Sequence, residues 1–102
     1  MRKADASGAD FTASTLDGTD LKEATLGGAD FTGASIKGAD LSRADLTDAI
    51  LHDAALMTAF LTDANLTGAD LTGANLRFAE LDGAILCNTT MEDGTINNEG
   101  CP

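Results

Sequence analysis

Residues 64–76 read Ala-Asn-Leu-Thr-Gly-Ala-Asp-Leu-Thr-Gly-Ala-Asn-Leu, so a leucine recurs at every fifth position with an alanine two residues before it. The same spacing continues in both directions. Stepping by five from Phe11 meets a large apolar residue eighteen times in succession. These central residues are Phe11, Leu16, Leu21, Leu26, Phe31, Ile36, Leu41, Leu46, Leu51, Leu56, Leu61, Leu66, Leu71, Leu76, Leu81, Leu86, Met91 and Ile96.

The residue two positions before each central residue is small: it is alanine in fourteen of the eighteen units, and the exceptions are Ser14, Thr19, Thr89 and Gly94. A period of five fits neither the 3.6-residue turn of a helix nor the two-residue alternation of a strand. It fits a chain that turns a corner in every unit and points the central and small residues inward. The sequence therefore predicts a solenoid with a narrow core, whose other three positions in each unit face water.

Polar and flexible residues occupy the positions where such corners are expected. Glycine often closes a unit, at Gly8, Gly18, Gly28, Gly33, Gly38, Gly68, Gly73 and Gly83. This placement predicts turns with backbone angles that glycine tolerates best. The Asp, Asn, Ser and Thr residues between the small and central positions are expected to cap free amides at these turns.

Units such as Ala29-Asp30-Phe31 and Ala64-Asn65-Leu66 resemble those of the pentapeptide-repeat family over nearly the whole chain. The resemblance implies an all-β fold, a right-handed quadrilateral β-helix of about four to five coils stacked about 4.8 Å apart. Residues 1–102 would then form a single domain. The closing run is also similar to the tail of cyanobacterial and chloroplast thylakoid-lumen members, so residues 87–102 are expected to form a C-terminal capping tail.

Four units a coil would stack residues twenty apart. The central residues Phe11, Phe31, Leu51, Leu71 and Met91 would line one wall, and Leu21, Leu41, Leu61 and Leu81 another. The two phenylalanines are expected to stack in the core. On the outside, Glu23, Arg43 and Asp63 would share a column, as would Asp17 and Lys37, and opposite charges in register stabilise neighbouring strands.

A third outer column contains Asp10, Asp30 and Asp70 and is broken by Ile50. The sequence leaves two interpretations of it open: an acidic stripe that imitates a DNA backbone, or aspartates that cap turns and face solvent. The single histidine, His52, is expected to be a solvated residue on an outer face.

Three large apolar residues, Met57, Phe60 and Phe78, occupy positions predicted to face out. They are expected to form one exposed patch at a single corner, which would bind a partner or a second copy of the chain. The alternative is that they are scattered surface residues of the kind that most proteins tolerate. The first unit, Ala4-Asp5-Ala6-Ser7-Gly8, has only alanine at its centre, so an open coil end is a second expected route to a homodimer.

Charge limits the classes of partner. Asp and Glu number 17 against 6 Lys and Arg, a net charge of −11, which opposes direct binding to nucleic acids and to anionic membranes. No apolar run is long enough to span a membrane, and the N-terminus has no secretion-signal pattern, although a removed leader stays open.

Two cysteines, Cys87 and Cys101, match no common zinc or redox motif. We favour a disulfide, which in the chain-entropy model stabilises a loop of this size by about 3 kcal/mol. A disulfide would indicate an oxidising compartment, a thylakoid lumen or a periplasm. Unpaired thiols in the cytoplasm are the alternative.

No catalytic residue, cofactor or metal site is predicted, because a narrow prism offers no cleft and no nucleophile with a base. The sequence therefore favours a non-catalytic structural or protein-interaction module that presents an acidic surface to an unidentified protein partner. The family resemblance also allows a DNA-mimicking regulator of a protein such as DNA gyrase.

Overall fold

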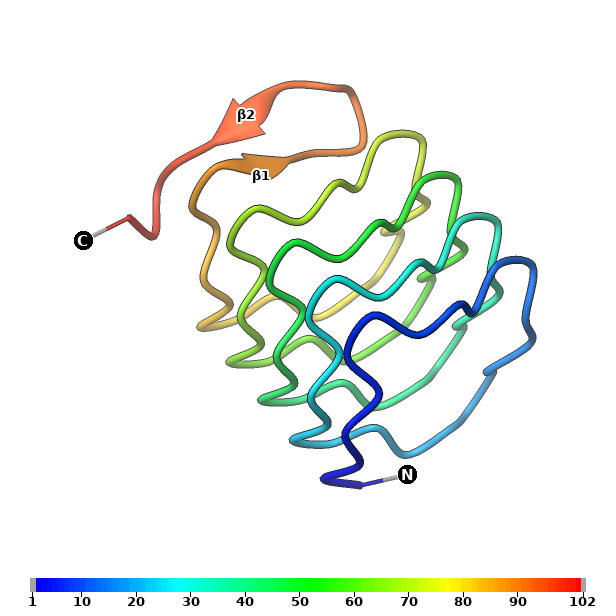
Figure 1. The fold of residues 1–102 in the computed structure, drawn as a ribbon. Coiled ribbons are helices and arrows are strands. Elements are labelled where there is room, and N and C mark those ends of the chain that lie inside the picture. Colours follow the sequence, from blue (N-terminus) through cyan, green and yellow to red (C-terminus); the bar gives the residue numbers. More distant parts are fainter. Residues whose placement is uncertain (1, 102) are drawn as a thin grey trace.

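The chain winds into a square solenoid, as the computed structural model of residues 2–101 shows (Figure 1). Successive coils lie side by side and are joined by fourteen isolated parallel β-bridges, from Asp5–Thr25 to Asp70–Thr90. Every bridge links residues twenty apart. The twenty-residue coil and the quadrilateral β-helix that the family resemblance implies are therefore confirmed. Met1 and Pro102, the ends of the predicted domain, lie outside the described residues.

Each corner is a tight turn that follows a central residue. The carbonyl oxygen of Phe31, for example, accepts a hydrogen bond from the amide of Ala34 at 2.9 Å. The second residue after the central one has a positive φ, 68° at Gly33, which is the pattern of a type II turn. The predicted backbone role of the closing glycines is thus confirmed, although Thr58 and Phe78 adopt the same conformation with φ of 59° and 61°.

Two sets of backbone hydrogen bonds hold each coil to the next. The amide of Phe31 donates to the carbonyl of Ile50 at 2.7 Å, and the amide of Ile50 donates to the carbonyl of Ala29 at 2.9 Å. The same pairing recurs on every face. Since the peptide groups are satisfied between coils, the side chains of the central and small residues are free to fill the interior.

The core is a column of large and small side chains in alternation. Central residues from Leu21 to Leu71 are at most 1% exposed, and the alanines from Ala24 to Ala74 at most 6%. The rings of Phe11 and Phe31 are stacked with centroids 4.9 Å apart. Central residues of the end coils are only partly buried; they are Phe11, Leu16, Leu76, Leu81, Leu86 and Met91.

The repeat ends before Ile96, which the five-residue spacing placed in the core. Strand β1 (Thr89–Thr90) pairs antiparallel with β2 (Ile96–Asn97). The amide of Met91 donates to the carbonyl of Thr95, so the chain turns back on itself instead of completing another unit. Ile96 is therefore 57% exposed, and the prediction for it was wrong. Within residues 2–101 no helix is long and apolar enough to cross a membrane.

Candidate protein-binding surface

The outer surface is a lattice of side chains held by local hydrogen bonds. We call the residue before each central residue the bridge position, because the β-bridges form there. An Asp or Asn at this position accepts a hydrogen bond from the amide two residues later: the Oδ1 atom of Asp30 accepts from Thr32 N at 2.9 Å and from Thr32 Oγ1 at 2.6 Å. The Thr32 hydroxyl and amide hold the pKa of Asp30 below its usual value.

The aspartates of the broken acidic column all cap turns. Asp10, Asp30 and Asp70 each accept the amide of the threonine two residues later, at 2.9 to 3.0 Å. Their carboxylates thus stabilise the turns by accepting backbone hydrogen bonds, whether or not they also bind a partner. Of the two interpretations that the sequence left open, the structure supplies direct contacts for turn capping.

His52 lies two residues after Ile50, which replaces the capping aspartate and so breaks this column. Its Nε2 atom is 2.5 Å from Oδ2 of Asp70 on the next coil, and the His52 side chain is 44% exposed. The hydrogen bond with Asp70 raises the pKa of His52 and outweighs the opposing effect of burial. His52 thus lies on an outer face and is partly exposed to solvent, as expected, but its ring also contacts the Asp70 carboxylate, which the sequence analysis did not predict.

Other charged side chains also link neighbouring coils. Arg43 meets Glu23 at 3.8 Å, as their shared column predicted, but within residues 2–101 it forms no ion pair with Asp63. Lys22 contacts Asp40 at 3.5 Å. Asp17 does not bind the Lys37 ammonium; its Oδ1 accepts the Lys37 amide at 3.0 Å.

The three outward apolar residues lie at one corner on two adjacent coils. The amide of Thr58 donates to the carbonyl of Arg77 at 3.0 Å, and Phe60 bridges to Glu80, so residues 57–60 run beside residues 77–80. Phe60 is 45% and Phe78 77% exposed, whereas Met57 is half-buried. We call Met57, Phe60, Arg77 and Phe78 the apolar corner.

Arg77 is a member of this corner that the sequence reasoning missed. Its guanidinium carbon lies 5.6 Å from the centre of the Phe78 ring, within reach of a cation–π interaction. Its place directly before Phe78 in the sequence was the signal that could have identified it. Three other exposed apolar residues, Ile50, Ile85 and Ile96, lie outside this corner.

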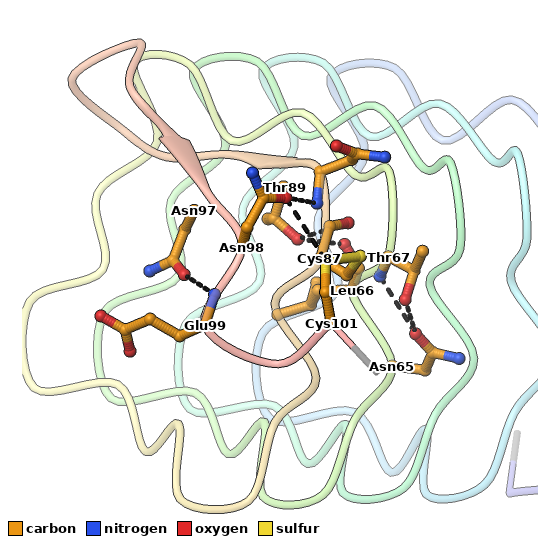
Figure 2. Close-up of a disulfide and its surroundings, with 10 residues drawn as sticks. Asn65, Leu66, Thr67, Cys87, Thr89, Asn97, Asn98, Glu99 and Cys101 are labelled. Carbon is orange, nitrogen blue, oxygen red and sulfur yellow. Dashed lines mark hydrogen bonds between the residues drawn. A yellow bond between two sulfur atoms is a disulfide. The ribbon is translucent and has the colours of Figure 1, made fainter.

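At the C-terminal end a disulfide joins Cys87 to Cys101, as predicted (Figure 2). Figure 2 shows residues 97–101 running alongside Cys87. The amide of Gly100 donates to the carbonyl of Leu86 at 2.9 Å, and Oδ1 of Asn98 accepts the amide of Asn88 at 2.7 Å. The predicted capping tail, residues 87–102, thus contains the β1–β2 hairpin and a covalently held end.

Within residues 2–101 the structure contains no pocket and no group of three residues that could hold a metal ion. What it offers is a solenoid of tandem five-residue units with one apolar corner. A family model described as "Pentapeptide repeats (8 copies)" matches residues 1–28, 26–63 and 61–93. The chain belongs to the pentapeptide-repeat family.

Solved structures agree with this assignment. Rfr23, a pentapeptide repeat protein from the cyanobacterium Cyanothece 51142, is 36% identical with a TM-score of 0.80; the match covers 80% of this chain and 56% of Rfr23. This chain therefore spans little more than half the length of that relative. A pentapeptide repeat protein from the Arabidopsis thaliana thylakoid lumen is also 36% identical, with a TM-score of 0.76, over 94% of this chain and 70% of the other.

A more distant likeness is to QnrB1, described as a plasmid-mediated fluoroquinolone resistance protein. It is 25% identical with a TM-score of 0.82, over 89% of this chain and 48% of QnrB1. No curated protein matches the chain by sequence.

Proposed function

We propose that this chain is a non-catalytic protein-binding module that presents its acidic outer surface, and above all the apolar corner, to a protein partner. The observation that carries the proposal is the exposure of two aromatic side chains, 45% for Phe60 and 77% for Phe78, at one corner. Aromatic residues, methionine and arginine are enriched in protein interfaces. All four residues of the apolar corner are of these types.

The interior supports binding rather than catalysis. Among residues 2–101 the buried side chains are apolar except Thr89, whose hydroxyl donates to the carbonyl of Leu66 at 2.7 Å. No titratable group is therefore held inside, where burial would shift its pKa toward a catalytic value. The functional groups of this chain lie on its outside.

A photo-cross-linking amino acid in place of Phe78 tests the proposal in a native extract. We expect adducts of defined mass that are lost when Phe60→Asp is added, because a charge at the corner opposes apolar contact. The matched control carries the cross-linker in place of Asp53, an exposed residue at the same turn position of another corner. Identical adducts from both positions, or no effect of Phe60→Asp, would contradict the proposal. An adduct of twice the mass of the chain would identify a second copy as the partner.

The structure favours this function over DNA mimicry. A mimic needs a continuous acidic face, but Ile50 interrupts the column of Asp10, Asp30 and Asp70, and His52 lies against the Asp70 carboxylate. We expect micromolar protein to leave gyrase supercoiling unchanged. Inhibition at that concentration would reverse the order of the two functions.

The disulfide and the similarity to a thylakoid-lumen protein support an oxidising compartment, a thylakoid lumen or a periplasm. We expect both cysteines to resist alkylation in a freshly quenched extract until a reductant is added. Labelling before reduction would contradict this location and favour the cytoplasm.

A further inference from the structure

The apolar corner contains a cation that lacks an acidic partner on an otherwise acid-rich chain. Three of the six basic side chains, those of Arg2, Lys22 and Arg43, form ion pairs. Lys3, Lys37 and Arg77 form none with any residue between 2 and 101. Arg77 is the one of these three that lies against an exposed aromatic ring, that of Phe78.

Lys37, Met57 and Arg77 occupy the same turn position on three consecutive coils. The amide of Gly38 donates to the carbonyl of Met57, and the amide of Thr58 to the carbonyl of Arg77, each at 3.0 Å. Their side chains therefore form one column, with a methionine between two cations. The pKa of Asp17 is lowered by the hydrogen bonds that it accepts from the Ser35 hydroxyl and the Lys37 amide, and to a lesser extent by the charge of Lys37. The Lys37 ammonium therefore already interacts with one carboxylate. Arg77 is the freer cation.

Two aromatic side chains of the apolar corner stand where the repeat mostly has glycine or a polar residue. Phe78 occupies the second turn position and has a φ of 61°, the conformation that this position also has at Gly33 and Thr58. Phe60 stands at a bridge position, between Asp40 and Glu80, where it supplies no oxygen to cap the following turn. Large apolar side chains exposed together at one place point to a function.

From these observations we infer that the apolar corner docks a protein segment that carries an apolar side chain next to a single carboxylate. The apolar side chain packs on Phe60 and Phe78, and the carboxylate pairs with the guanidinium of Arg77. Glu80, which bridges to Phe60, lies at the edge of the site and disfavours a second negative charge. This inference rests on the proposed protein-binding function and names the chemistry of the partner.

The charge preference is the feature that can be tested most sharply. The net charge of −11 attracts cationic peptides to the molecule as a whole, whereas Arg77 favours an anionic one at this corner. The probes are three capped tetrapeptides, Leu-Phe-Glu-Leu, Leu-Phe-Gln-Leu and Leu-Phe-Lys-Leu, titrated into isotope-labelled full-length protein at low salt. The readout is the chemical shift of the backbone amides.

We expect the Glu peptide to shift the amides of Thr58, Phe60 and Phe78, with a dissociation constant roughly two- to fivefold below that of the Gln peptide, as for an exposed ion pair. The Lys peptide should bind this corner most weakly. Arg77→Glu should reverse the order of the three peptides. The matched control Arg43→Glu, which changes an arginine already paired with Glu23, should leave the order unchanged.

Three results would overturn the inference: shifts that lie elsewhere on the molecule, stronger binding of the Lys peptide at the corner, or an order that Arg77→Glu does not alter. If all three peptides shift the corner equally and Phe78→Ser abolishes the shifts, the corner binds apolar segments without a carboxylate. In that case the protein-binding function stands and the charge assignment fails. If no peptide binds while cross-linking through position 78 succeeds, the partner has a different chemistry and the inference again fails.

Discussion

Gly33 has a φ of 68°, and an added Cβ atom would meet nothing within 4 Å. Its backbone conformation is therefore the only obstacle to a larger side chain. Gly27 differs, because its φ is not in the left-handed region and an added Cβ would lie at an ordinary 3.5 Å from the Thr47 carbonyl oxygen. The two glycines separate backbone strain from crowding.

We expect Gly33→Ala to lower the free energy of unfolding by about 1 kcal/mol, because the left-handed conformation costs an L-residue more than the loss of glycine entropy returns. Gly27→Ala should leave it unchanged or raise it by up to about 1 kcal/mol. Urea unfolding of both variants measures the difference. Equal losses at the two positions would show that the turn does not require a positive φ.

His52 and Asp70 form a residue pair whose strength depends on pH. The pKa of His52 is raised in the folded state, so its contribution to stability is complete below the unfolded pKa of about 6.5 and is lost as pH rises through the folded value. Burial raises the pKa of Asp70, but the hydrogen bonds from Thr72 and His52 outweigh it and lower the value. The contribution of Asp70 is therefore lost as pH falls through its folded pKa.

The stability advantage of the wild type over His52→Gln should be largest between about pH 4 and pH 6.5, where both groups are charged in either state. It should disappear at high pH. An NMR titration gives an independent measurement: Asp70→Asn should move the pKa of His52 back toward its ordinary value. An unchanged His52 pKa in that variant would show that His52 and Asp70 do not form an ion pair in solution.

At the scale of a coil, stability depends on how completely the neighbouring coils enclose a central leucine. Leu46 is 1% exposed between two coils, whereas Leu16, a central residue of the first coil, is only partly buried. Each coil of a solenoid contacts only its neighbours, so an end coil lacks half of this enclosure. The same truncation should therefore have unequal effects.

Leu46→Ala should cost about 2–5 kcal/mol, the range for a leucine removed from a closed core. Leu16→Ala should cost clearly less, because water already reaches that side chain. Thermal and urea unfolding of the two variants give the comparison. A loss at Leu16 as large as that at Leu46 would mean that another element covers the first coil in solution.

At the scale of the whole molecule, the C-terminal end carries restraints in addition to the hydrogen bonds between coils. The C-terminal end is held by the β1–β2 hairpin and by the disulfide from Cys87 to Cys101. Inside the hairpin, the buried hydroxyl of Thr89 ties β1 to Leu66 on the previous coil. Cleaving the disulfide removes one of these restraints and leaves the hydrogen bonds between coils in place.

Reduction, or the double variant Cys87→Ser with Cys101→Ser, should lower stability by about 3 kcal/mol in the chain-entropy model. Hydrogen exchange should accelerate at the amide of Gly100, which bonds to Leu86, and remain slow at the amide of Leu46, which bonds to Asn65. Native-state exchange followed by mass spectrometry resolves the two. Acceleration at both amides alike would indicate that the tail controls the whole solenoid.

Much of this molecule could be predicted from its repeat. A five-residue period with one large and one small apolar position admits one inward arrangement, because only a corner in each unit brings both side chains to a common axis. The burial of Leu41 and Leu61 and the outward position of Phe78 follow from that period. The stack of Phe11 on Phe31 needs in addition the four-unit coil that the family resemblance implies.

Only the tertiary structure decided where the period stops and which side chains meet across coils. Ile96 keeps the spacing but lies on a hairpin, because the hydrogen bond from Met91 to Thr95 competes with another turn of the solenoid. His52 meets Asp70, and Arg77 covers Phe78, through side-chain conformations that a period does not specify. A sequence repeat determines which way a residue faces, whereas the contact it makes depends on the three-dimensional position of its neighbours.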